Sequence, residues 1–133
     1  MTETSPKYSI EVNDDITVIS VWGSLSYDDA KFLLSKLAME NIYHFRCIDV
    51  SRVNITYTKE EVMGLSDHSK SIYKDNNRSA IIVGDDLAYG IIRSLIAYRE
   101  EDAHMKMNVF RSVNKGVSWL KQQKELLQEL NQD

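Results

Sequence analysis

The sequence predicts an α/β domain built on a mostly parallel five-stranded sheet with an N-terminal antiparallel hairpin. Short β-branched runs alternate with stretches whose apolar residues recur at helical spacing, in the order β-β-α-β-α-β-α-β-α. The later runs are apolar on both faces, which is typical of strands buried within a parallel sheet. A strand that follows a helix implies a right-handed parallel crossover, so only the first two strands are expected to be antiparallel.

The first two strands are expected at residues 8–12 and 16–22, and Asn13-Asp14-Asp15 between them reads as a hairpin turn. The first helix lies in SYDDAKFLLSKLAMEN, with Ser26 as its candidate N-cap. Its apolar residues recur at helical spacing: Ala30, Leu33, Leu34, Leu37 and Ala38.

The second helix is expected to begin near Lys59, because Thr58 and Glu61 have the spacing of a capping box. Its inner stripe is expected to contain Val62, Leu65, Ser69, Ile72 and Tyr73. The other elements are a strand at 45–50, a strand at 79–84, a helix capped by Asp85, a strand at 107–110 and a last helix capped by Ser112.

The length of 133 residues suits one domain, expected to span 1–133 with residues 1–7 and 128–133 frayed. The start, MTETSPKYS, lacks the apolar run of a secretion signal, and the apolar stretch YGIIRSLIAY contains Arg93 and is too short to span a bilayer. We therefore expect a cytoplasmic protein with no membrane span.

The net charge of −4 supplies no basic surface for phosphate backbones, so nucleic-acid binding is not expected. Cys47 is the single cysteine, which excludes an intramolecular disulfide. Its place in the apolar run FRCIDV predicts a small buried residue without thiol chemistry.

Four stretches together resemble the SpoIIAA-like branch of the STAS proteins, which are relatives of sulfate-transporter tails and anti-sigma factor antagonists. They are GSLSYDD, CIDVS, SAIIVGDD and the ending VFRSVNKGVSWL, and the resemblance covers about residues 8–121. In the ending, Gly116 stands at an alanine-like position, Val117 and Leu120 are expected to face the sheet, and Trp119 to cover the rim of the core. The resemblance implies a regulatory module that acts through protein contact.

One segment departs from that family. Phosphoregulated STAS proteins carry an Asp-Ser-Ser-Gly-like stretch before the second helix, whose serine is the phosphorylation switch, whereas this chain has ITYTKEE. A phosphate on Thr58 would be repelled by Glu60 and Glu61. Thr58 is therefore expected to be a plain N-cap.

Three groups of residues have the types found in catalytic or metal sites: Asp67-His68-Ser69; Glu101 and His104; and Asp49, Asp85 and Asp86. Consecutive helical residues point about 100° apart and cannot form a catalytic triad. We therefore expect Asp67, His68 and Ser69 to be solvated polar residues. A carboxylate-histidine metal site needs a second copy of the spacing, which the sequence lacks. The three aspartates could converge at the carboxyl ends of strands, although helix caps explain two of them. We expect no enzyme, no metal and no cofactor.

The start of the last helix is the best small-anion site in the sequence. The other three helices open with carboxylates, whereas this one opens with Arg111, Ser112 as N-cap, and Lys115. Free amides and positive side chains would there suit phosphate, sulfate or a carboxylate. The alternative is that Arg111 and Lys115 are solvated and pair with acidic neighbours.

The third helix carries an apolar arc wider than one sheet contact needs. Its candidate interface or ligand face consists of Tyr89, Ile92, Leu95, Ile96 and Tyr98. A helix sandwiched within the monomer, a homodimer contact or a groove for an apolar ligand would use the same residues. The SpoIIAA-like fold is similar to that of CRAL-TRIO lipid carriers, which favours the ligand by analogy.

The sequence thus predicts a non-enzymatic STAS-like binding or regulatory module with an unknown protein partner. The alternative is a carrier or sensor of a small apolar or anionic ligand.

Overall fold

The computed structural model describes residues 7–13, 15–39, 45–55, 57–72, 77–98 and 105–130. Several residues considered above lie outside this part of the chain: Asp14, Tyr73, Glu101 and His104, and the side chains of Asn13, Ala38, Ser69, Ile72 and Tyr98. Of the ends expected to fray, Lys7 belongs to the first strand and residues 128–130 to the last helix.

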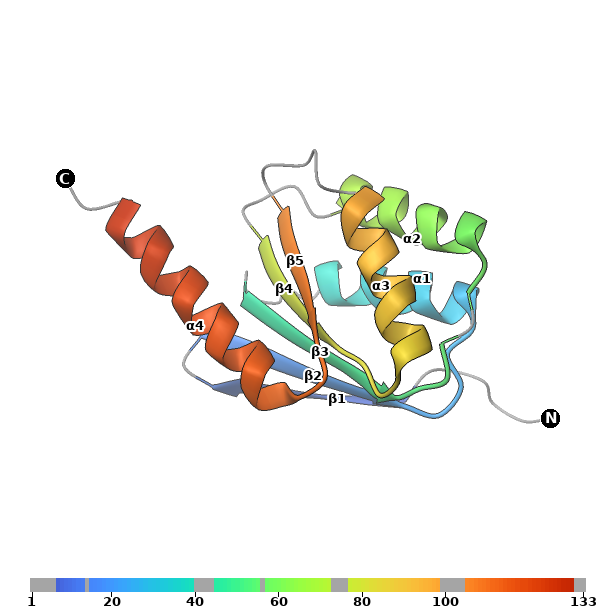
Figure 1. Cartoon of the computed structure of the whole chain (residues 1–133), viewed down its shortest axis with the longest axis horizontal. Coiled ribbons are helices and arrows are strands. Elements are labelled where there is room, and N and C mark those ends of the chain that lie inside the picture. The colour runs from blue at the N-terminus through green and yellow to red at the C-terminus, as the bar shows by residue number, and fades with distance from the viewer. Residues whose placement is uncertain are drawn as a thin grey trace.

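The sheet has five strands in the order of the chain, β1-β2-β3-β4-β5 (Figure 1). β1 and β2 form the antiparallel hairpin, and every later neighbour is parallel. The strands are β1 (Lys7–Asn13), β2 (Ile16–Trp22), β3 (Phe45–Arg52), β4 (Asn77–Ile82) and β5 (Met105–Phe110). The predicted fold class is therefore confirmed. Asp15 in the hairpin turn has φ 66°, a left-handed conformation that aspartate tolerates.

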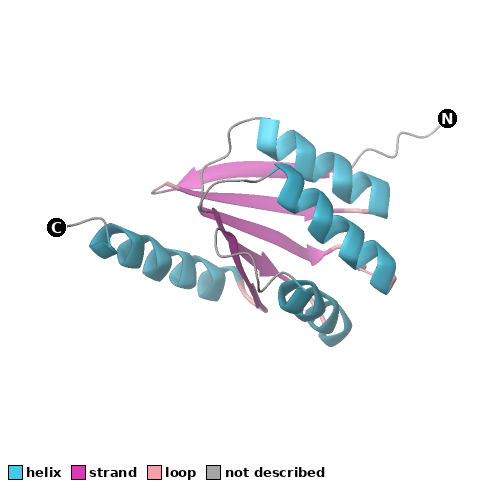
Figure 2. Ribbon diagram, turned by 90° about the horizontal axis from the view of Figure 1, so that it is seen from above, coloured by secondary structure: helices cyan, strands magenta, loops and turns pink. Residues whose placement is uncertain are grey.

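Four helices cover the two faces of the sheet: α1 (Tyr27–Met39), α2 (Lys59–Ile72), α3 (Asp86–Tyr98) and α4 (Val113–Leu130). α1, α2 and α3 lie on one face and α4 alone crosses the other (Figures 1 and 2). No helix in the described part of the chain is long and apolar enough to cross a membrane.

Each helix begins where the sequence predicts, because a short polar side chain caps its first turn. At α2 the capping box is reciprocal: Thr58 N donates to Glu61 Oε1 over 2.9 Å, and Glu61 N donates to Thr58 Oγ1 over 3.1 Å. The other three caps accept from backbone amides: Ser26 Oγ from Asp29 N at 3.1 Å, Asp85 Oδ1 from Ala88 N at 2.8 Å, and Ser112 Oγ from Lys115 N at 3.2 Å.

The α4 face of the sheet is closely packed. Leu120 is fully buried in a cluster with Ile16, Cys47, Ala80 and Ile82. The ring of Trp119 lies at the rim, 5.9 Å from that of Phe110 between centroids, as the ending of the sequence predicts. α4 approaches so near that a Cβ on Gly116 would lie 2.7 Å from Ile82 Cδ1.

Candidate functional site

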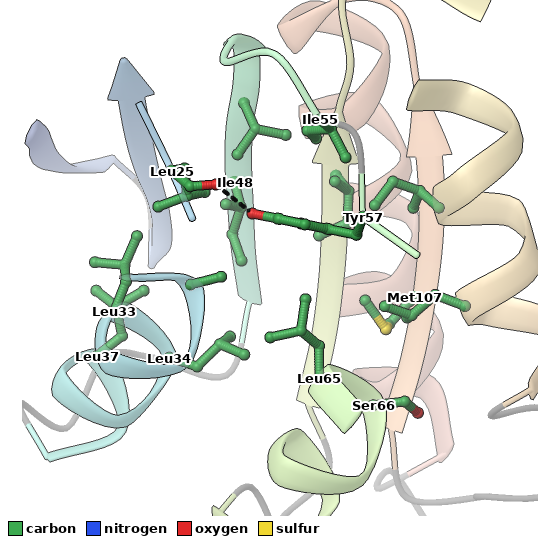
Figure 3. Close-up of a pocket in the computed structure, with 15 residues that line it drawn as sticks. Leu25, Leu33, Leu34, Leu37, Ile48, Ile55, Tyr57, Leu65, Ser66 and Met107 are labelled. Carbon is green, nitrogen blue, oxygen red and sulfur yellow. Dashed lines mark hydrogen bonds between the residues drawn. The ribbon is translucent and has the colours of Figure 1, made fainter. Parts of the chain in front are cut away.

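The opposite face of the sheet carries the larger hydrophobic core, and a pocket lies within that core. An apolar pocket of about 120 Å³ lies between the sheet and helices α1, α2 and α3 (Figure 3). Leucines of α1 and α2 face isoleucines of the sheet across it, and its lining includes Leu33, Leu34, Leu37, Leu65, Ile48 and Ile81.

The partial exposure of Ile48 shows that the helices leave a gap above β3 at the pocket. Ile48 lies in the middle of β3, paired with Ile19 of β2 and Ile81 of β4. Both neighbours are buried, at 0% and 7% exposure, whereas Ile48 is only partly buried. A central strand residue keeps accessible surface only where the helices above it leave a gap.

Tyr57 lies across the pocket (Figure 3). This residue precedes α2, and its side chain reaches across to the loop before α1, where its hydroxyl donates to Leu25 O over 2.9 Å (Figure 3). Burial, with Glu61 and Asp29 nearby, raises the pKa of Tyr57 to about 12, so the hydroxyl stays protonated and donates at neutral pH. The bond ties the loop before α2 to the loop before α1.

A wider groove of about 510 Å³ lies on the other side of Tyr57, between α2 and α3. Val62 and Met63 of α2 line it, together with Ile91 and Ser94 of α3. Tyr57 is the residue that lines both this groove and the pocket.

Ser66 is the polar residue of the pocket whose hydroxyl is not engaged. Its side chain is fully buried on α2, and no described residue supplies a hydrogen-bond partner for its Oγ. It lies at the end of the pocket away from the bond between Tyr57 and Leu25 (Figure 3). Sequence reasoning missed Ser66 and placed Ser69 on the inner stripe. The signal was present, since Val62, Leu65 and Ser66 have the spacing i, i+3, i+4.

The structure divides the predicted face of α3 between the inside and the outside of the monomer. Ile92 and Leu95 are 9% and 8% exposed and line the pocket, and Ile96 packs partly buried against the same core. Tyr89 is 36% exposed on the outside. α3 is thus sandwiched within the monomer along its Ile92 and Leu95 side, and the roles proposed for the set as an interface or ligand face remain predictions.

The predicted anion site at the start of α4 is only partly assembled. Arg111 reaches to α3, where its Nη1 lies 2.7 Å from Asp86 Oδ1 and its Nη2 donates to Gly84 O over 3.1 Å. Ser112 caps α4, and Lys115 is exposed. The positive charge of Arg111 is paired with an acidic neighbour, so anion binding by Arg111, Ser112 and Lys115 remains a prediction.

The other candidate residues have structural partners. Asp49 Oδ1 accepts from Ser51 N at 3.0 Å and from Ser51 Oγ at 2.6 Å, so this carboxylate satisfies its own loop. His68 was expected to be solvated, but it is half-buried, and its Nε2 is hydrogen-bonded to Ser35 Oγ of α1 over 2.8 Å. That expectation was wrong because α1 packs on this side of α2. Among the described residues, no three His, Cys, Asp or Glu side chains are placed to hold a metal ion.

No protein-family model matches the sequence, and no curated protein is significantly similar to it. The fold, however, is similar to solved structures. One is an anti-sigma factor antagonist from Mycobacterium paratuberculosis, with 12% sequence identity and a TM-score of 0.59, covering 88% of this chain and 95% of that one. Another is an uncharacterised protein with a SpoIIAA-like fold from Shewanella loihica PV-4, with 18% identity and a TM-score of 0.54, covering 90% and 98% of the two chains.

A third similar structure is the anti-sigma factor antagonist SpoIIAA in its unphosphorylated form, with 10% identity and a TM-score of 0.48, covering 86% of this chain and 98% of that one. The first two likenesses extend over nearly whole chains. The chain therefore has the SpoIIAA-like fold, and the resemblance read from the sequence is confirmed at the level of the fold.

Proposed function

We propose that this chain is a non-enzymatic, cytoplasmic regulatory module that acts by contact with a protein partner. The observation that supports this proposal is a group of exposed side chains at the start of α3, which we name the α3 entry patch: Asp86, Leu87, Tyr89 and Arg111. The similarity in fold to the anti-sigma factor antagonist from Mycobacterium paratuberculosis agrees with a regulatory role.

The α3 entry patch has the composition of a protein contact. Leu87 is 63% exposed and Tyr89 is 36% exposed in the first turn of α3, where their side chains point about 200° apart and so flank the helix start on two sides. Beside them the Arg111–Asp86 pair is exposed, with 48% and 99% of the two side chains accessible. Apolar and aromatic anchors rimmed by charges are typical of partner-binding surfaces.

The test compares recovery of a partner by three forms of the tagged protein. Leu87→Ser combined with Tyr89→Ser removes the apolar anchors, and Leu126→Ser is the matched control, because Leu126 is a 51% exposed leucine on α4. The partner should cross-link to the patch and be recovered with the wild type and the control, and at least tenfold less with the double variant. Equal recovery with all three folded proteins would show that the patch is not the contact surface.

A second copy of the chain is one partner that the patch could take. In that case sedimentation velocity of the purified wild type shows a dimer, and the double variant sediments as a folded monomer. Ile92 belongs to the face predicted for a homodimer contact, but it lies inside the monomer. Ile92→Glu would therefore bury a charge in the core and would not test the dimer.

A further inference from the structure

We propose that the apolar pocket between the sheet and helices α1, α2 and α3 binds a small uncharged molecule with an apolar body about the size of one aromatic ring and a single hydroxyl group. Ser66 supplies the hydrogen bond. This inference does not depend on the proposed partner contact, which uses the outer surface of α3.

The volume of the pocket sets the size of the ligand. An engineered protein cavity of about 150 Å³ with an apolar lining binds benzene. The pocket here measures about 120 Å³, and its lining residues are leucines, isoleucines and other apolar side chains apart from Tyr57 and Ser66. No charged side chain lines it, so a charged ligand would lose its hydration without compensation.

The two polar side chains decide which chemistry is accepted. The Tyr57 hydroxyl already donates to Leu25 O, and its raised pKa keeps it in that donor role. The Ser66 hydroxyl is buried and has no hydrogen-bond partner among the described residues. It can donate or accept, because its hydrogen rotates about the C–O bond. A purely apolar ligand would leave Ser66 unsatisfied, whereas a ligand hydroxyl would pair with it after rotation about the Ser66 Cα–Cβ bond turns Oγ, now without accessible surface, toward the pocket.

Tyr57 also defines a route into the pocket. Tyr57 lines both the groove between α2 and α3 and the pocket. We expect that displacing this one side chain breaks its hydrogen bond to Leu25 O and connects the two spaces. A ligand can thus enter without separating a helix from the sheet.

The test uses p-cresol and p-xylene, which have nearly the same shape and differ by a hydroxyl against a methyl group. Binding to the intact chain is followed by amide chemical shifts in NMR titrations. Both probes should shift residues around Ile48, Leu65 and Ile92. Ser66→Ala should weaken p-cresol at least tenfold and leave p-xylene within about twofold, since only p-cresol loses a partner. No saturable p-cresol binding, or an equal effect of Ser66→Ala on both probes, would overturn the proposal.

A second pair of variants tests the location. Ala30 is 8% exposed and lines the pocket, so Ala30→Leu places three carbons inside it. Ala97→Leu makes the same change at an exposed position of α3. Ala30→Leu should abolish binding of both probes, whereas Ala97→Leu should bind them like the wild type. Undiminished binding by folded Ala30→Leu would exclude this pocket as the site.

Discussion

Gly116 allows α4 to lie close to the sheet. A Cβ at this position would lie 2.7 Å from Ile82 Cδ1, 3.2 Å from Ala80 Cβ and 3.5 Å from Cys47 Sγ. The first two distances are shorter than ordinary van der Waals contacts, and Ala80 and Ile82 are buried and cannot move freely. An alanine would match the family pattern at this position but not this packing.

Gly116→Ala should lower the free energy of unfolding by about 1 to 2 kcal/mol, because the overpacking outweighs the gain in helix propensity. Gly90→Ala on α3 is the control, since nothing lies within 4 Å of a Cβ there. That control should raise stability by about 0.5 to 1 kcal/mol. Urea denaturation measures the change in the free energy of unfolding for both variants. A gain in stability from Gly116→Ala would contradict the close packing of α4 on the sheet.

Cys47 should be unreactive in the folded protein. Burial, with Asp49 nearby, raises the pKa of its thiol from 9.0 to about 12, and the side chain is fully buried beneath α4. Ellman's reagent at pH 8 should react within seconds in 8 M urea and on the timescale of unfolding in buffer. Rapid reaction of the native protein would show that the thiol is accessible.

Among the elements, the start of α2 gives a physical reason to expect that Thr58 is an N-cap and not a phosphorylation switch. The Thr58 hydroxyl and the Glu61 carboxylate satisfy each other's backbone amides. A phosphate on Thr58 would remove this cap and meet the charge of Glu61.

Thr58→Ala should therefore cost about 1 kcal/mol of stability, whereas Thr58→Ser should change it little, since serine caps equally well. Thermal unfolding of the two variants measures the difference. Equal stability of both variants would show that the capping box does not stabilise α2.

Tyr57 connects two elements and makes their contact sensitive to alkali. Its pKa is raised from 10.0 to about 12, so the unfolded chain releases this proton at lower pH than the folded chain. The stabilisation is complete below pH 10 and is lost as pH rises toward 12.

Tyr57→Phe should cost about 1 kcal/mol at neutral pH, because Leu25 O loses its donor. Between pH 10 and 12 its stability should fall less steeply than that of the wild type. Some fall should persist, because the pKa of Cys47 is raised in the same range. The free energy of unfolding is measured by chemical denaturation at several pH values. The same dependence on pH in the wild type and in Tyr57→Phe would contradict the raised pKa of Tyr57.

The sequence was sufficient for the elements, because their signals are local. Each helix start is marked by a capping hydrogen bond between residues three apart in the sequence. The capping residues are Ser26, Thr58 (with Glu61), Asp85 and Ser112. The pocket could not be predicted in this way. It depends on how far α1 and α2 stand from β3, and the sequence around Ile48 has the same apolar character as that of tightly packed strands. Arg111 likewise has a partner 25 residues away that spacing alone does not indicate.

At the scale of the whole molecule, the two faces of the sheet differ in packing. On the α4 face, side chains such as Leu120 and Ile82 are fully buried against a helix in close approach. On the other face three helices leave the apolar pocket over Ile48. The closely packed side around Leu120 thus lies opposite the side that carries the pocket.

Methyl NMR under xenon pressure tests this asymmetry most directly, because xenon enters apolar cavities and needs no hydrogen bond. The isoleucine and leucine methyls of Ile48, Leu65 and Ile92 should shift with saturation as xenon pressure rises. Those of Ile16, Ile82 and Leu120 should not shift. Equal responses on both faces, or no response at Ile48, would contradict the account of a pocket over Ile48 and close packing around Leu120.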